Sequence, residues 1–299
     1  MDQLMRNPWA GRCLVSLFAL FEHAQVMSYG NRMIEADQGN WTSNAKDLFD
    51  GLAKLALRFT GDAYMVIYVL SMLLSLLGLL LYVVLLPKIH QWNRQSGFLA
   101  LSVLFADYVI FGLGFVPMMS ALSEVQYCND DGKLKDYTST VCWDHQQLSM
   151  LVFAFFGASA VLLMSAVVGP ILKSERKGVE MRWVDEAYFP GLMRLLDVGI
   201  INIFAAVHHA YLGITACCVL IIYLALFQCY KDNFIASVKM AVLWGDLWVF
   251  ICAQEVTNSN SKGSDLLAGW VPAMLFGYCL MWVVWVFRKK QPAKLALEK

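Results

Sequence analysis

The sequence predicts an all-α polytopic membrane protein, a bundle of about eight transmembrane helices. Its 299 residues are 59% hydrophobic and only 15% charged, whereas soluble proteins are about 45–50% apolar and about 25% charged. The apolar residues gather into runs of about 17–25 residues, the length that crosses a bilayer as a helix. We therefore expect a single transmembrane helical domain over residues 1–299.

Eight apolar runs predict the spans, and a count of seven stays open because two of the runs are interrupted by charge. The first run contains Glu22 and His23, and the fifth contains Arg194 and Asp197. The predicted spans are Ala10–Ser28, Tyr64–Leu86, Gly97–Leu122, Leu148–Leu172, Pro190–Val207, Tyr211–Cys229, Phe234–Val256 and Leu267–Phe287.

The distribution of Lys and Arg predicts which side of the membrane each loop faces. Cytoplasmic loops carry an excess of these residues, and the loops on the side of the N-terminus are richer in them than the opposite loops, residues 29–63, 123–147 and 257–266. Both termini are therefore expected in the cytoplasm, including the basic tail 288–299.

The opposite loops contain features typical of a non-cytoplasmic, oxidising compartment. Asn40 begins the sequon Asn40-Trp41-Thr42, a glycosylation signal in a secretory membrane. Cys128 and Cys142 share one polar loop and can form a disulfide there. The expected location is an integral, multi-pass protein of the plasma membrane or an endomembrane.

Composition and motifs also limit the partners and the chemistry. A formal net charge of zero predicts no nucleic-acid partner. The lipid bilayer is the expected partner, and a homo-oligomer of this chain is left open. The sequence contains no Walker, GxSxG or dinucleotide motif and no Cys/His spacing typical of a metal site. We therefore predict neither an enzyme nor a metal centre.

Ionisable residues inside the predicted spans mark the candidate site. Lys239 lies within Phe234–Val256, where a lysine costs roughly 2.5–3.5 kcal/mol on insertion scales. Asp246 follows it by seven residues and faces the same side of a helix. Asp107 lies in the third span, so it can pair with Lys239 if the helices touch. Such a pair is either functional or joins helices structurally; alternatively Lys239 extends to the membrane surface.

His23 in the first span has two interpretations. A lone helix histidine is most often a hydrogen-bonded packing residue. It can also relay protons, since imidazole changes charge near neutral pH. The sequence leaves both open.

Several short stretches match, in order, motifs of one family. They are His23-Ala24-Gln25, Asp107-Tyr108, Phe155-Phe156-Gly157-Ala158-Ser159-Ala160, Tyr211-Leu212-Gly213-Ile214 and Val238-Lys239-Met240-Ala241-Val242-Leu243-Trp244. Together, over roughly residues 10–256, they resemble the heliorhodopsins among the microbial rhodopsins. A cytoplasmic N-terminus is also the orientation of that family. The chain departs from it in having Asp107 where the family has glutamate and in its eighth span.

The resemblance implies a retinal cofactor. Lys239 would bind retinal as a protonated Schiff base, with Asp107 as its counterion and Tyr108 and Trp244 beside it. A buried cation next to a carboxylate keeps both groups charged. The residues implied to accept or relay the proton are His23, Asp246 and Glu255.

Three functions follow as expectations. The first is a light-responsive membrane protein, either a photosensor or a light-gated proton conductance. The second is a chromophore-free ion or proton channel or transporter that uses Asp107, Lys239 and Asp246, because intramembrane charges often line pathways. The third is a structural or assembly protein whose charges join helices.

Overall fold

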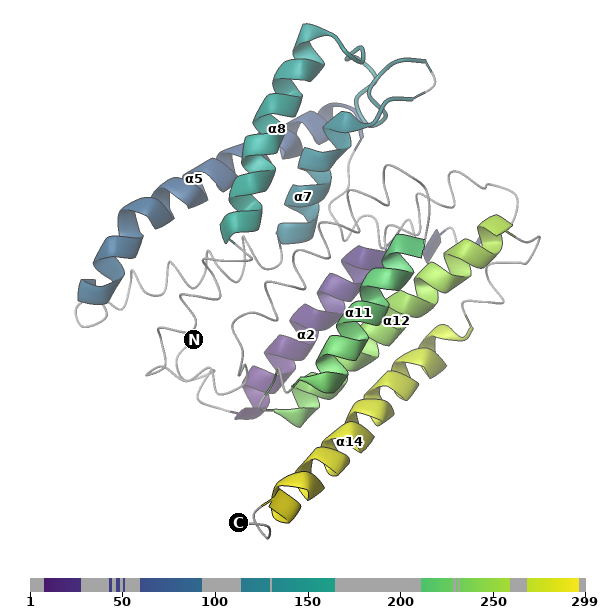
Figure 1. The fold of residues 1–299 in the computed structure, drawn as a ribbon. Coiled ribbons are helices and arrows are strands. Elements are labelled where there is room, and N and C mark those ends of the chain that lie inside the picture. The colour runs from purple at the N-terminus through teal and green to yellow at the C-terminus, as the bar shows by residue number, and fades with distance from the viewer. Residues whose placement is uncertain are drawn as a thin grey trace. The chain divides into compact units, whose positions relative to one another are not determined.

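The computed structural model describes residues 8–27, 43–44, 47–48, 51, 60–92, 114–129, 131–164, 211–227, 230, 232–258 and 268–295. Over these residues the all-α prediction is confirmed, since the regular elements are helices and the β-bridges among them are isolated (Figure 1). The elements are α2 (Pro8–Met27), α5 (Asp62–Trp92), α7 (Phe115–Ser123), the 3-10 helix η2 (Glu124–Gln126), α8 (His145–Leu163), α11 (Tyr211–Leu226), α12 (Asn233–Asn258) and α14 (Trp270–Leu295).

Four of the helices are long and apolar enough to cross a membrane. These segments are Asp62–Leu80, His145–Leu163, Asn233–Val256 and Trp270–Arg288. The predicted span Pro190–Val207 and most of Gly97–Leu122 lie outside the described residues. The count of eight spans and the sides of the termini stay predictions.

The exposed surfaces of α5 and α8 are strongly apolar. Leu73, Leu80 and Phe155 are 58%, 60% and 68% exposed, while Ser71 and Ser75 are buried. Large contiguous apolar surfaces are rare on soluble monomers. The arrangement supports the membrane class that the composition predicts.

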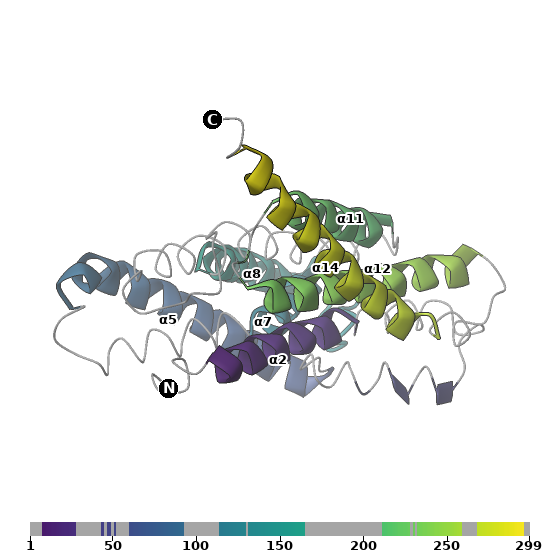
Figure 2. The ribbon, with the colours of Figure 1, turned by 90° about the horizontal axis from the view of Figure 1, so that it is seen from below.

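The chain forms two compact units. The four-helix unit contains α2, α11, α12 and α14, and the disulfide unit contains α5, α7, η2 and α8. In the four-helix unit α12 is the central helix, because it packs against each of the other three (Figures 1 and 2). In the candidate span of α12, 67% of the sequence is buried inside the protein, whereas in the candidate span of α14 only 11% is buried. Helix α12 is therefore the element around which a site in this unit is built.

The helices of the four-helix unit alternate in direction. Helices α2 and α12 are parallel, because Arg12 contacts Asp232 near their first turns and His23 contacts Asp246 further along both. Helix α14 is antiparallel to α12, since Gly269, just before α14, lies against Trp248, whereas Gly277, further along α14, lies against Met240. If both parallel helices span the membrane, the chain between them must cross an odd number of times. The five spans predicted between them satisfy this parity.

Glycines allow α12 to approach its neighbours closely. A Cβ atom on Gly277 of α14 would lie 2.5 Å from Cδ1 of Trp244 and 2.8 Å from the carbonyl oxygen of Met240. A Cβ on Gly213 of α11 would lie 2.7 Å from the ring of Phe250. Helices in lipid associate by close van der Waals packing, which requires small residues where they cross.

In the disulfide unit, two tyrosines of α5 tie the helices together. The hydroxyl of Tyr64 donates to the carbonyl oxygen of Ala121 in α7, at 3.0 Å, and that of Tyr68 donates to the carbonyl oxygen of Met150 in α8, at 2.7 Å. A hydroxyl in an apolar environment needs such a partner. These bonds keep the three helices in register.

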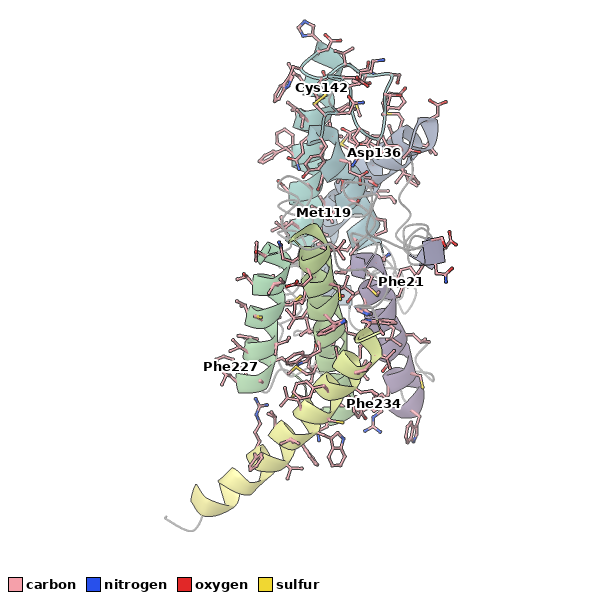
Figure 3. The ribbon with its side chains drawn as sticks, turned by 90° about the vertical axis from the view of Figure 1, so that its right-hand side faces the viewer. Phe21, Met119, Asp136, Cys142, Phe227 and Phe234 are labelled. Carbon is pink, nitrogen blue, oxygen red and sulfur yellow. A yellow bond between two sulfur atoms is a disulfide. The ribbon has the colours of Figure 1, made fainter. Side chains whose placement is uncertain are left out.

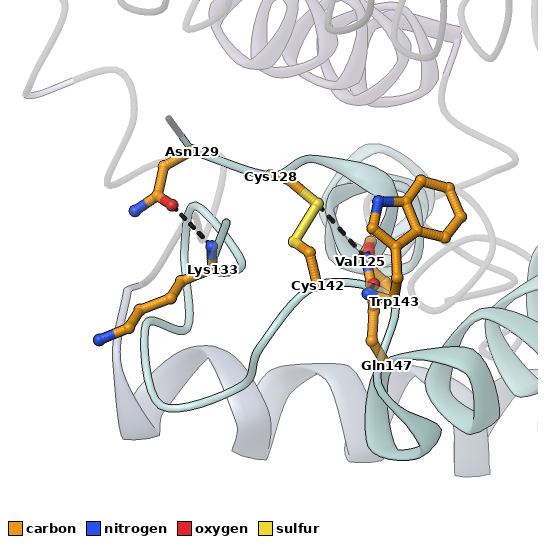
Figure 4. The surroundings of a disulfide bond; sticks show 7 residues. All are labelled: Val125, Cys128, Asn129, Lys133, Cys142, Trp143 and Gln147. Atoms are coloured by element: carbon orange, nitrogen blue, oxygen red, sulfur yellow. Dashed lines mark hydrogen bonds between the residues drawn. A yellow bond between two sulfur atoms is a disulfide. The ribbon is translucent and has the colours of Figure 1, made fainter. Parts of the chain in front are cut away.

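A disulfide-bonded loop connects η2 to α8 (Figure 4). Cys128 and Cys142 are joined, with their Cα atoms 6.2 Å apart. The loop also contacts the start of α5, because the Gly61 amide donates to the carbonyl oxygen of Asp136, at 2.7 Å. The sequon residue Asn40 lies outside the described residues.

Gln147 in the first turn of α8 holds the base of this loop. Its amide nitrogen donates to the carbonyl oxygen of Val125, at 2.9 Å, and its oxygen accepts from the backbone amide of Trp143 (Figure 4). Trp143 has φ of 68°, the left-handed region in which a tryptophan is rare. Trp143 directly follows Cys142 of the disulfide, donates to Gln147 and is 75% exposed.

Candidate functional site

Three pairs of ionisable side chains join α2 to α12, and this set is the candidate site. On α12 the charged residues are spaced by seven, which is nearly two helical turns, so all three face α2. We call the set the ion-pair row. Its pairs are Arg12–Asp232, Glu22–Lys239 and His23–Asp246.

The first pair lies where α12 begins. Arg12 Nε is 2.8 Å from Asp232 Oδ2. The other oxygen of Asp232 accepts hydrogen bonds from the backbone amides of Phe234, at 2.9 Å, and Ile235, at 3.4 Å. A side chain that accepts from these amides caps a helix N-terminus. Asp232 therefore starts α12 and also binds Arg12.

The second pair contains Lys239. Its Nζ lies 3.1 Å from Glu22 Oε2, and the two side chains are only 13% and 18% exposed. Helix α14 begins opposite Trp248, so Lys239 lies near the middle of the stretch of α12 that its neighbours cover. The lysine is paired inside a helix interface, and the interpretation that it extends to the membrane surface does not describe this structure.

The third pair is extended by a tryptophan from α14. His23 Nδ1 lies 2.6 Å from Asp246 Oδ1, and Trp270 Nε1 lies 3.1 Å from His23 Nε2. An indole N–H only donates, so Nε2 must be the accepting nitrogen of the ring. His23 then carries its proton on Nδ1 and donates it to Asp246. These contacts are the ones that an imidazole with its proton on Nδ1 can make.

Three helices meet at this third pair because residue 245 is glycine. A Cβ atom on Gly245 would lie 2.9 Å from both His23 Cε1 and Met274 Cγ, and 3.0 Å from Trp270 Nε1. The rings of His23 and Trp270 are nearly parallel, with centroids 5.5 Å apart and planes inclined by 19°. Glycine leaves the space in which the histidine and the indole can approach α12 together.

The structure brings three of the predicted site residues together. Lys239, Asp246 and His23 all lie in the α2–α12 interface. Asp107 and Tyr108 lie outside the described residues, so the pairing of Asp107 with Lys239 stays a prediction.

Two predicted site residues lie elsewhere on α12. Trp244 faces α14, where its ring meets Phe276 edge to face at 4.9 Å. Glu255 is exposed, and nine residues beyond Asp246 place it about 180° around the helix. Neither belongs to the ion-pair row.

Sequence reasoning did not assign Glu22 and Trp270 to the site. The position of Glu22 could have predicted its role. A carboxylate inside an apolar run needs a positively charged partner, in the same way that Lys239 needs a negatively charged one. Trp270 gave no signal, since tryptophan is common at the ends of membrane spans.

Within the part of the chain that the structure describes, no cluster of three or more His, Cys, Asp or Glu side chains could hold a metal ion. Comparison of the chain with models of protein families, with curated proteins and with solved structures gave no match. The site is therefore interpreted from its own geometry.

Proposed function

We propose that the ion-pair row conducts protons across a membrane, as part of a channel or transporter that needs no chromophore. One observation carries the proposal: three ionisable pairs follow one another along a single interface of a helix long enough to span a bilayer. From Asp232 to Asp246 is fourteen residues, or about 21 Å of helix. This length covers most of a hydrocarbon core of about 30 Å.

The chemistry of the row suits protons. Glu22, Asp246 and His23 each bind and release a proton, while the Arg12 guanidinium stays charged. The Lys239 ammonium lies in the middle of the row and repels other cations. Successive charged residues on α12 are about 10 Å apart, so water molecules must complete the path between pairs.

Residues at one end of the four-helix unit support the predicted cytoplasmic orientation of that end. Trp9 is 67% exposed, and its ring centroid lies 5.4 Å from the Arg12 guanidinium carbon. Phe227 and Phe234, at the end of α11 and the start of α12, lie toward this same end of the unit (Figure 3). Arg288 donates to the carbonyl oxygens of Phe227, at 3.4 Å, and Ala225 at the end of α11. Exposed tryptophans and basic residues are typical of a membrane interface, with an excess of basic residues on the cytoplasmic side.

The flux through the row can be measured in proteoliposomes that contain a pH-sensitive dye. Asp246→Asn and Glu22→Gln are each expected to lower proton flux at least tenfold, because each amide removes a proton-binding oxygen from the row. The matched control is Asp144→Asn, an exposed carboxylate at the start of α8 in the other unit, which should leave the flux unchanged. Absence of flux in the parent protein, or equal flux in all variants, would refute the proposal.

A second function, retinal binding, is favoured by the environment of Lys239. Its primary amine lies next to a carboxylate inside the helix interface, which is the arrangement an attached cationic cofactor requires. In this proposal Lys239 attaches retinal and Glu22 contributes to its counterion, alone or with Asp107. Retinal would supply a light-driven change of shape when bound. Trp244 faces α14, so we do not include it among the residues that would contact retinal.

An absorption spectrum after reconstitution with all-trans retinal tests this second function. We expect a visible band that is lost in both Lys239→Ala and Lys239→Arg, because arginine keeps the charge but cannot form the covalent link. Glu22→Gln should shift the band if Glu22 balances the charge. A well-folded protein without a visible band would exclude retinal and leave the proton pathway as the proposal.

A further inference from the structure

We infer that Trp270 is a positioning residue that sets which nitrogen of His23 carries the proton, and that a second proton on His23 breaks its contact with α14. Only the place of His23 in a proton pathway rests on the proposed function; the role of Trp270 does not. The contacts that carry it are the two hydrogen bonds of the His23 ring.

The first step is the assignment of the tautomer. A neutral imidazole has one donor and one acceptor nitrogen, and either tautomer is available to a free histidine. Trp270 removes this choice, because its N–H occupies Nε2 at 3.1 Å and accepts nothing in return. The proton is thereby directed to Nδ1, which faces Asp246 at 2.6 Å.

The second step is the effect of protonation. When Nε2 gains a proton, two N–H groups face each other and the hydrogen bond to Trp270 is lost. The His23 ring cannot relieve this contact by moving toward α12, because both rings already pack closely on Gly245. A Cβ atom at that position would lie only 2.9 Å from His23 Cε1 and 3.0 Å from Trp270 Nε1. Trp270 is the first residue of α14, directly after a turn at residues 268–269. The displacement is therefore expected in the first turn of α14.

The groups that face His23 come from two helices packed against it. Helix α12 contributes Asp246, which is in direct contact, and Lys239, which is bound to Glu22 on the same helix as His23. Helix α14 contributes Trp270 and Met274, neither of which titrates. Asp246 can balance the imidazolium charge, so protonation separates Trp270 from the ring while the His23–Asp246 pair stays together.

Nitrogen NMR of the full chain in lipid nanodiscs tests the first step, because the ring nitrogens of the two tautomers give distinct shifts. His23→Gln assigns the signal. We expect the Nδ1–H form in the parent protein and appearance of the Nε2–H form in Trp270→Phe, which keeps an aromatic ring and removes the donor. Trp282→Phe, an exposed tryptophan on the same helix, is the matched control and should change nothing. An unchanged tautomer in Trp270→Phe would overturn the inference.

The second step is tested in the parent protein, so it does not depend on a variant that folds. The indole N–H signal that disappears in Trp270→Phe is followed as the pH is lowered. We expect it to shift together with the His23 ring signal. A titration of His23 that leaves the Trp270 signal in place would contradict the inference. Neither measurement uses proton flux. If the protein shows both spectral changes but conducts no protons, the proposed function is refuted and the inference about Trp270 stands.

Discussion

Replacing Lys239 with methionine is expected to lower the free energy of unfolding by about 3–5 kcal/mol. The substitution leaves the Glu22 carboxylate in a mostly buried interface without the ammonium that lies 3.1 Å away in the parent protein. Denaturation in mixed detergent micelles, followed by circular dichroism, measures the change. Lys133→Met is the matched control, because Lys133 is exposed in the disulfide loop and its loss should change stability by no more than about 0.5 kcal/mol.

The double variant Glu22→Met, Lys239→Met separates a structural role from a functional one. Apolar residues of similar volume often replace a buried ion pair without loss of stability, so we expect the double variant to unfold at or above the stability of the parent. Proton flux should nevertheless be lost. If the double variant is stable and conducts normally, the Glu22–Lys239 pair only joins helices, and the structural or assembly role becomes the better interpretation of this pair.

The second large effect is expected for Gly277→Ala. Alanine normally stabilises a helix relative to glycine by up to about 1 kcal/mol, but here the new Cβ would stand 2.8 Å from the carbonyl oxygen of Met240. Backbone cannot move aside as a flexible side chain can, so α14 must shift away from α12. We expect a net loss of about 1–3 kcal/mol, the usual cost of overpacking.

The same detergent denaturation checks this prediction. Gly51→Ala is the matched control, since nothing lies within 4 Å of the added Cβ and the backbone is not in the left-handed region. It should leave stability within about 0.5 kcal/mol of the parent. Equal stability of Gly277→Ala and the parent would show that α14 does not pack against α12 as closely as described.

Properties that depend on neighbouring residues were predictable from the sequence. The helical content and the membrane class follow from the length and composition of apolar runs. The common face of Lys239 and Asp246 follows from their spacing of seven, because helix geometry is local. The presence of Cys128 and Cys142 in one polar loop likewise indicated the disulfide that the structure contains.

The identity of the partners was decided only by the tertiary structure. Glu22 and Lys239 are 217 positions apart, and Trp270 and His23 are 247 apart. No local pattern encodes which helices touch, and from the sequence Lys239 was paired with Asp107 and not with Glu22. Close packing at Gly245 and Gly277 brings α2 and α14 onto α12. That packing brings the separate charged residues together as a row of pairs and places a donor-only indole on His23. Hydrogen bonds and ion pairs form only between groups that the fold brings within about 3 Å.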